Sequence, residues 1–378
     1  MCTSQVAVVH VSDDVFRAVE QAMSLAQWQD HVPAGADVSL KPNLCFDHLV
    51  PGFQTSPWVL EAVIEIIRPH VGQLCVVEAD TSTTSADRGA RATGILEVCR
   101  RHNIPWINLS RERFVSVPVH DGLYFQDHLE LPEILTRTYL ITLPVLKTHC
   151  LTGVTGAIKN QFGCLPLNRY IYHPVLDQVL ADLLSVLRPV FCLMDGTIGS
   201  EGSGPKQGHP RVADLVLASA DPVALDAVAA RIIGFDPEAI GHIRLCAQQG
   251  LGVADLERIA IVGHQIGILN LHFQPARKNL VAALDLGLRL PLLGPLIFDT
   301  PLIWLFRWGA RWEYLLWLVL KGWRYREEIR EHSWYAEQWW PRFHAEMSQS
   351  SAYPQSGPVR RLRTVVYIVR EVLRGERD

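Results

Sequence analysis

Up to about residue 265 the chain alternates short apolar runs with longer segments of helical spacing, and this alternation restricts its fold more than any other feature. Short β-branched runs are typical of buried strands, and strands that alternate with helices form βαβ units in a mostly parallel sheet. We therefore expect a three-layer α/β domain. The predicted strands cover residues 5–11, 37–40, 74–77, 139–143 and 190–194, and the predicted helices cover 15–25, 58–67, 90–101, 175–187 and 222–233.

Charged residues recur at one end of the predicted strands. Lys41, Asp80, Lys147 and Asp195 each lie at or just beyond the carboxyl end of a strand. Ligands of open α/β sheets bind at that edge, because the loops that follow parallel strands gather there. Turns also favour polar residues, but four charges on the same side favour a ligand site.

The composition excludes several classes of protein. Hydrophobic residues make up 48% of the 378 residues and charged residues 20%, which is usual for a globular chain and rules out a disordered, collagenous or coiled-coil protein. The formal net charge of −4 gives no overall attraction to nucleic acid, and we expect no nucleic-acid partner.

The cysteines and the first residues indicate the compartment. None of the eight cysteines forms a CxxC pair, and a chain of this length does not resemble a small disulfide-linked secreted domain. The N-terminus lacks the basic-then-apolar order of a secretory signal. No uncharged stretch approaches the roughly 18 residues needed to span a bilayer. The prediction is a cytoplasmic protein with reduced thiols.

The chain divides into four parts. We expect the α/β core over residues 1–268, a tryptophan-rich helical extension over 269–347, a polar linker over 348–358 and a basic amphipathic tail over 359–378. Eight of the 11 tryptophans fall in the extension, and the first four have the spacing of one helix face. They are Trp304, Trp308, Trp312 and Trp317.

Two interpretations of the extension remain open. An aromatic helical subdomain could simply pack on the core. Alternatively, residues 290–325 could contact a membrane surface, because tryptophan combines an apolar ring with a polar N–H group and arginines intersperse with the tryptophans. That second interpretation places the protein at the periphery of the inner face of the membrane.

Four polar, glycine- and proline-punctuated segments follow the predicted strands. They are Leu40-Lys41-Pro42-Asn43 with Thr55-Ser56-Pro57, residues 143–164 with His173, residues 195–208, and residues 218–237. In this order they resemble the family catalogued as domain of unknown function 362 (DUF362), over roughly residues 5–265. The resemblance implies the α/β core but no settled activity.

Many members of that family resemble this core joined to a ferredoxin-like domain, whose CxxCxxC cysteines hold iron–sulfur clusters. The C-terminal third of this chain contains no cysteine. The resemblance therefore implies that any such electron donor would be a separate ferredoxin-like partner.

Three lysines are the candidates for holding an anion. Lys41, Lys147 and Lys159 would concentrate positive charge at the sheet edge, and a lysine ammonium suits phosphate or carboxylate. The hydroxyl-rich run over 81–85 precedes a predicted helix, where it either caps the helix or adds an anion site. The other candidate binding residues are polar or flexible residues of the same segments: Asn43, Thr55, Asn160, Gly202 and Gly204.

Two histidines and two carboxylates are the candidates for proton transfer. His149 and His173 flank the segment that carries Lys159, and histidine titrates near neutral pH. Asp80 or Asp195 would complete the acid–base pair.

Three cysteines lie within two residues of these motifs. If the motifs converge, Cys45, Cys150 and Cys164 together with a histidine would suffice to hold zinc or an iron–sulfur cluster. Buried thiols without a metal explain the same positions.

The sequence thus favours an enzyme that acts on an anionic, phosphate- or carboxylate-bearing small molecule at the carboxyl edge of the sheet. A redox protein with a metal or cluster at the three cysteines is one alternative, and a non-catalytic membrane-surface adaptor is another. The enzyme hypothesis depends on whether basic residues far apart in sequence meet in one crevice.

Overall fold

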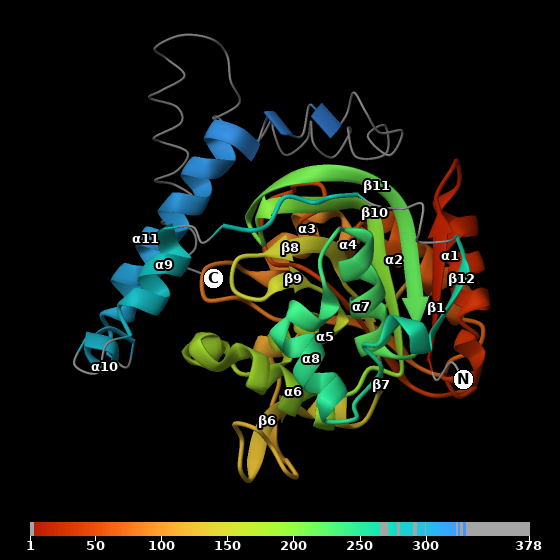
Figure 1. The fold of residues 1–378 in the computed structure, drawn as a ribbon, viewed down its shortest axis with the longest axis horizontal. Helices are drawn as coiled ribbons and strands as arrows, with labels where there is room; N and C mark the ends of the chain where they lie inside the picture. The colour runs from red at the N-terminus through yellow and green to blue at the C-terminus, as the bar shows by residue number, and fades with distance from the viewer. Residues whose placement is uncertain are drawn as a thin grey trace.

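The computed structural model describes residues 4–264, 271–277, 280–289, 293–298, 300–322, 324–325 and 328–329. Within these residues the chain forms a ten-stranded sheet (Figure 1). Eight strands follow the order β12-β1-β11-β10-β7-β2-β3-β4, and in addition β8 pairs with β10 and β9 pairs with β8. The strands are β1 (Ser4–His10), β2 (Val38–Pro42), β3 (Leu74–Glu78), β4 (Trp106–Asn108), β7 (Tyr139–Leu143), β8 (Val145–His149), β9 (Gly153–Thr155), β10 (Phe191–Ser203), β11 (Gln207–Ser219) and β12 (Ile259–Gly263). A separate antiparallel pair consists of β5 (Phe114–Pro118) and β6 (His128–Pro132).

Helices cover both faces of the sheet, which confirms the predicted three-layer, mostly parallel α/β domain. Strand β1 illustrates the cause: Ala7 and Val9 face one hydrophobic core, whereas Val6 and Val8 face the other. The first core includes α1 (Val15–Leu25), α2 (Pro57–Ile67), α3 (Ala86–Thr93) and α4 (Ile95–Arg101). The second includes α5 (Ala157–Asn160), α6 (Leu176–Val186), α7 (Pro222–Ile232) and α8 (Gly241–Gln248).

Two predicted elements differ from those observed. The helix expected over 90–101 starts earlier and is broken at Gly94, whose φ of 86° only glycine adopts easily, so that α3 and α4 are separate. The strand expected over 190–194 is longer, because β10 continues into a hairpin with β11 that pairs as far as Ser203 and Gln207. The glycine-rich segment expected to be a loop is therefore the tip of a hairpin.

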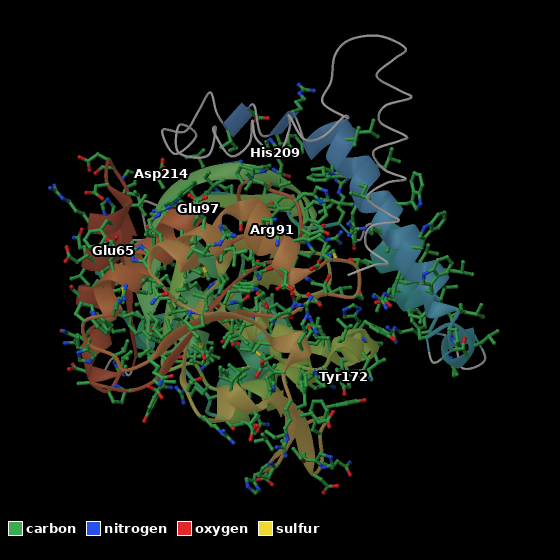
Figure 2. All side chains as sticks on the ribbon, turned by 180° about the vertical axis from the view of Figure 1, so that it is seen from behind. Glu65, Arg91, Glu97, Tyr172, His209 and Asp214 are labelled. Atoms are coloured by element: carbon green, nitrogen blue, oxygen red, sulfur yellow. The ribbon has the colours of Figure 1, made fainter. Side chains whose placement is uncertain are left out.

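The C-terminal extension lies beside this body and contains α9 (Leu280–Gly287), α10 (Leu293–Phe298) and α11 (Ile303–Trp317) (Figure 1). Figure 2 shows from behind that α11 runs along one side of the α/β body. None of the described helices combines the length and the apolar character required to cross a bilayer. The predicted linker over 348–358, the tail over 359–378 and the later tryptophans lie outside the described residues.

Candidate functional site

One cavity of about 230 Å³ lies between the carboxyl edge of the sheet and the C-terminal extension. Its lining includes Lys41 near the end of β2 and Asn43 just after it, the last residue of β8, His149, with the following Cys150, and Lys159 and Asn160 of α5. His173 and Cys45 also line it. Half of the predicted binding residues and both predicted histidines therefore line one cavity, although Lys41 and Lys159 are more than 100 residues apart in sequence.

Lys41 forms the floor of the cavity together with a carboxylate that the sequence analysis missed. Its ammonium group donates a hydrogen bond of 2.7 Å to Glu78, the last residue of the neighbouring parallel strand β3. Both side chains are buried, so the ion pair is shielded from water. Glu78 also accepts a hydrogen bond from the backbone N–H of Leu44, which fixes the loop after β2.

Lys159 is positioned by a buried aspartate of α7. Asp226 accepts hydrogen bonds of 2.6 Å from Ala157 N–H and 3.0 Å from Ile158 N–H, at the start of α5. A Cβ atom on Gly156 would lie 2.1 Å from this carboxylate, so only glycine permits the contact. Burial, with the nearby charges of Arg169 and other cations, lowers the pKa of Lys159 to about 7.

The two predicted asparagines support each other. Asn43 donates its amide N–H to the amide oxygen of Asn160 at 2.9 Å. The Asn160 amide also donates to Thr142 Oγ1 at 2.8 Å. Lys147 stands behind this pair instead of lining the cavity, and its ammonium donates to Asn43 Oδ1 at 2.6 Å and to the carbonyl of Phe53 at 2.7 Å. Lys147 therefore positions Asn43.

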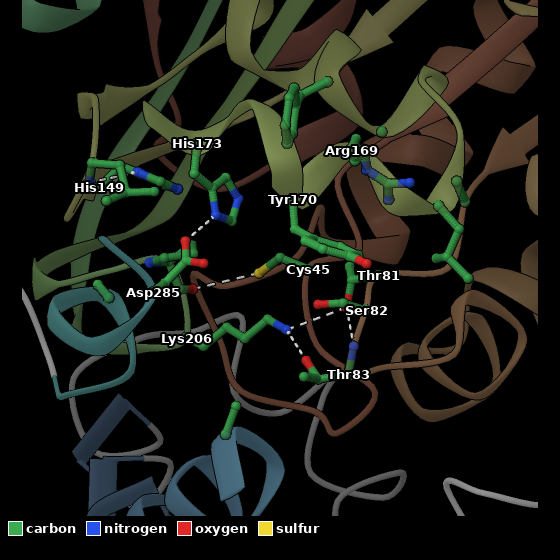
Figure 3. Close-up of a pocket in the computed structure, with 18 of the residues that line it drawn as sticks. Cys45, Thr81, Ser82, Thr83, His149, Arg169, Tyr170, His173, Lys206 and Asp285 are labelled. Atoms are coloured by element: carbon green, nitrogen blue, oxygen red, sulfur yellow. Dashed lines mark hydrogen bonds and ion pairs between the residues drawn. The ribbon is translucent and has the colours of Figure 1, made fainter. Parts of the chain in front are cut away.

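In the described part of the chain, three further cations line the cavity and were not predicted: Arg169 and Lys206 of the core, and Arg307 of α11. Arg169 lies in the 3₁₀-helical segment Leu167–Val175, is buried, and donates to the carbonyl of Asp80. Lys206 extends from the hairpin tip between β10 and β11 and donates to Thr83 Oγ1 at 2.9 Å (Figure 3). Burial lowers the pKa of Lys206 to about 8. The tip thus brings a charge to the hydroxyl-rich run over 81–85.

His173 has a carboxylate partner from the extension. Its Nδ1 atom is hydrogen bonded to Asp285 of α9, and Arg289 donates to the other oxygen of this carboxylate at 2.9 Å (Figure 3). Asp285 is buried, and both His173 and Asp285 line the cavity. A carboxylate on Nδ1 fixes the orientation of the ring and leaves Nε2 for a ligand.

His149 is a neutral hydrogen-bond donor. Its Nδ1 atom accepts the backbone N–H groups of Leu151 at 3.1 Å and Thr152 at 3.3 Å, which leaves the proton on Nε2. Burial, together with the charges of Lys159 and Lys147, holds the pKa of His149 well below its usual value. At neutral pH this imidazole can donate a hydrogen bond, but its Nδ1 lone pair is already used.

Three other predicted residues lie outside the cavity lining, and each supports the backbone; Asp195 lies within β10 because that strand is longer than predicted. Asp80 accepts from Ala86 N–H at 2.8 Å, at the start of α3. Asp195 is fully buried and accepts from the backbone N–H of Ser56 at 2.7 Å, just before α2, and burial raises its pKa. Thr55 donates to the carbonyl of Leu143 at 2.6 Å. None of the three lines the cavity in the part of the chain that the structure describes.

The glycines of the hairpin act indirectly. Gly202 and Gly204 do not line the cavity, whereas Pro205 and Lys206 beside them do. A Cβ atom on Gly204 would lie 2.1 Å from the carbonyl oxygen of Thr148, so this glycine allows the tip to pack against β8. The two glycines were predicted to bind the ligand, but they lie outside the lining. The hairpin tip instead places Lys206 in the cavity.

The three candidate cysteines do not form the predicted ligand set. Cys45 and Cys150 line the cavity, but Cys164 does not and is fully buried, and burial raises its pKa to about 12. Across the described residues, the one trio of His, Cys, Asp or Glu whose ligand atoms lie within 4.8 Å of one another contains no cysteine. The geometry therefore gives no support to a shared metal or cluster site at these thiols.

Buried ion pairs hold the extension against the core. Asp47, in the loop after β2, accepts from Arg311 of α11 at 3.0 Å and from Arg88 of α3 at 2.8 Å. Burial by itself would raise the pKa of Asp47, but the charges of His48, Arg311 and Arg88 outweigh it and hold the pKa well below its usual value. These contacts place α11 over the cavity.

The chain is similar in sequence to a curated protein and in fold to two solved structures. A curated thylakoid-associated protein of Synechocystis sp. is 30% identical over 234 residues, which cover 59% of this chain and 70% of that protein. The lactate racemase apoprotein of Thermoanaerobacterium thermosaccharolyticum is 12% identical with a TM-score of 0.39, over 61% of this chain and 57% of that structure. A protein of Thermotoga maritima is 9% identical with a TM-score of 0.36, over 62% of this chain and 59% of that structure. This chain thus spans less than two thirds of either solved structure.

The family model matches the part of the chain that builds the cavity floor. The model described as "Domain of unknown function (DUF362)" matches residues 38–231, from β2 to the end of α7. That range contains Lys41, Lys159, Arg169 and Lys206 but none of the extension. The resemblance found in the sequence motifs is confirmed, and the chain belongs to the DUF362 family.

Proposed function

We propose that the cavity binds an anionic small molecule, bearing a phosphate or a carboxylate, and that the protein is an enzyme that moves a proton on this ligand. The convergence of basic side chains carries the proposal. Among the described residues of the lining, five are lysine or arginine and two are aspartate or glutamate. The basic residues are Lys41, Lys159, Arg169, Lys206 and Arg307.

The environment of these charges favours binding of an anion. Burying cations near one another is costly, and an anion in their midst offsets that cost. Burial and the neighbouring cations lower the pKa of Lys159 to about 7, which means that its charged form is destabilised in the cavity. An anion beside Lys159 would favour its charged form, so binding near pH 7 is expected to take up a proton.

The histidines supply the chemistry. His173, oriented by Asp285, can accept a proton from the ligand or return it through Nε2. His149 offers an N–H group that can hydrogen bond to an oxygen on which negative charge develops. Lys41, Lys159, Arg169 and Lys206 would hold the anion so that its reacting atom lies between the two rings.

The test is calorimetric titration of the protein at pH 6.5 with phosphorylated and carboxylated metabolites. At least one should bind, and Lys159→Met and Lys206→Met should each weaken it by roughly 10-fold or more, because each removes a charge-assisted hydrogen bond. Arg17→Met removes an exposed cation of α1 and is the matched control, with no change expected. Equal affinities in all four proteins, or no binding by any compound, would contradict the proposal.

A second proposal, compatible with the first, is attachment to a membrane surface through α11. Its outward side exposes Trp304 at 50%, Leu305 at 54% and Trp308 at 40%, beside the exposed Leu302. Tryptophan and leucine on one side of a helix suit the boundary between headgroups and acyl chains. The relative described as thylakoid-associated supports this placement, and we propose the inner face of a membrane.

Co-sedimentation with vesicles of neutral and anionic phospholipids tests the attachment. The double variant Trp304→Ser/Trp308→Ser should remain in the supernatant, whereas the wild type should sediment. Phe16→Ser/Leu123→Ser removes two exposed apolar side chains elsewhere and serves as the control. If the tryptophan variant and the wild type partition equally, α11 does not mediate attachment.

A further inference from the structure

The cavity has two chemically different walls. The α/β core supplies the basic floor, from β2, α5, the segment Leu167–Val175 and the hairpin tip. The extension supplies a mainly apolar roof, with Asp285, Arg307 and Tyr314 as its polar members. The apolar side chains are Ala282, Phe298, Ile303, Phe306 and Ala310. If a phosphate or carboxylate binds on the floor, the remainder of the ligand would contact the apolar side chains of the roof.

The roof is a continuous stripe of α11. Ile303, Phe306 and Ala310 are three and four residues apart, the spacing that places side chains on one face of a helix. The rings of Phe298 and Phe306 lie 5.5 Å apart, which extends the stripe to α10. Helix α11 thus turns apolar side chains toward the cavity as well as outward.

The size of the cavity exceeds that of an anionic group. A water molecule takes up about 30 Å³ in the liquid, and a phosphate group is roughly two to three times as large. The cavity volume of about 230 Å³ therefore leaves room for more of the ligand than its anionic group. An apolar chain there would remove carbon surface from water, whereas a polar group would lose its hydrogen bonds.

From this division we infer that the ligand is a single-chain amphiphilic anion. Its headgroup lies on Lys41, Lys159 and Lys206, and its alkyl chain lies under α10 and α11. The inference rests on the proposed function and adds the class of ligand. It also gives the extension a binding role, because Phe298, Ile303 and Phe306 add an apolar face opposite the lysines of the core.

A chain-length series tests the inference. Inorganic phosphate, butyl phosphate and octyl phosphate carry the same headgroup, and octanol carries the longer chain without it. Calorimetric titration at pH 6.5, below the critical micelle concentration, should give an affinity that rises by roughly three-fold for each added methylene that is buried. Octanol should bind far more weakly than octyl phosphate.

Variants of α11 locate the chain. Phe306→Gln should weaken octyl phosphate by 10-fold or more and leave inorganic phosphate unchanged, because it makes the roof polar without touching the floor. Ala310→Leu, which fills space under the helix, should have the same selective effect by another route. Leu316→Gln changes an exposed leucine of the same helix and is the matched control.

The outcomes separate the inference from the proposed function. If all three phosphates bind equally and Lys159→Met weakens each of them, the anion site stands and the amphiphile is refuted. If octanol binds as tightly as octyl phosphate, or if neither the phosphates nor the carboxylated metabolites of the first titration bind, the anion site itself is refuted. A chain-length dependence that survives both Phe306→Gln and Ala310→Leu would also overturn the inference.

Discussion

The floor and the roof of the cavity are held in place by different physical means. The floor follows from the sheet, because Lys41 and Glu78 end neighbouring parallel strands and pair at 2.7 Å. The roof is held by the docking of α11 on the core, through the ion pair of Arg311 with Asp47 and through buried apolar residues such as Leu315 that join the first hydrophobic core. The first is part of a continuous hydrogen-bonded sheet, whereas the second is a docking of helices.

This difference indicates which part of the site can vary independently. Changing a floor residue alters charge at the end of a strand, where the backbone is fixed by its neighbours. Changing a docking residue can move a whole helix. The roof side chains of α11 and Asp285 of α9 would then move as well. We expect the affinity for the anion to depend on the floor, and the fit of the rest of the ligand to depend on the docking.

The largest effect is expected from Asp47→Ala, which breaks the docking. The substitution removes this carboxylate from the buried guanidinium group of Arg311 and the partly buried one of Arg88, and loss of one partner of a buried ion pair costs about 3–5 kcal/mol. Chemical denaturation should show this loss. Hydrogen exchange should accelerate more in α11 than in β2 and β3.

The control for this variant is Asp30→Ala, an exposed carboxylate, for which the change in unfolding free energy should stay within about 0.5 kcal/mol. The pH dependence has a defined sign. Because the pKa of Asp47 is held below its unfolded value, its stabilisation is present above about pH 4 and is lost as the pH falls further. A difference between variant and wild type that persisted unchanged in acid would contradict this role.

The next effect concerns catalysis at the boundary of the two regions. Asp285→Asn removes the negative charge beside His173, and loss of general acid–base catalysis lowers a rate by roughly 10²- to 10⁴-fold. With the substrate found in the titrations, kcat should fall accordingly while the ligand dissociation constant changes little. Glu130→Gln, on β6, is the control. A loss of binding with unchanged kcat would show that Asp285 only shapes the roof.

The α/β core could be predicted from sequence because its signals are local. Apolar alternation fixes strands such as β7, which begins and ends where predicted. Polar residues at the carboxyl ends pointed to the edge of the sheet where the cavity lies, and Lys41, Asn43 and Asn160 line it. The same signal also selected Asp195, because a charge after a strand looks alike whether it faces a ligand or accepts backbone N–H groups.

The other parts of the site depend on contacts that no local pattern reveals. Lys206 reaches the cavity only because β10 and β11 pair into a long hairpin. The glycine-rich sequence at the tip of this hairpin gives no sign of strand pairing. Asp285 faces His173 only because α9 is docked against the core, 112 residues further along the chain. Glu78 had a usable signal, since it follows the apolar run of β3 as Lys41 follows that of β2.

An effect of intermediate size is expected from Lys159→Met, which should weaken anion binding but stabilise the folded protein. Lys159 has a pKa of about 7 in the folded protein and a higher one when unfolded, so its charged form is disfavoured by folding. Lys159→Met should therefore raise the melting temperature by on the order of 2 °C or more below pH 7, and the gain should shrink between pH 7 and 10.5. Thermal unfolding at several pH values measures it. A gain independent of pH would mean that lost charge is not the cause.

The smallest effect lies at Tyr314, where roof and floor touch directly. The ammonium group of Lys206 sits 4.9 Å from the centre of the Tyr314 ring, so a residue of α11 contacts a cation of the hairpin tip. Tyr314→Leu should cost about 0.5–1 kcal/mol of unfolding free energy, the usual size of a cation–π contact. Tyr314→Phe keeps the ring and should cost less, because the face of the ring makes the contact. Equal losses in both variants would assign the contribution to the hydroxyl group, and the two regions would then be joined through Asp47 without help from the ring.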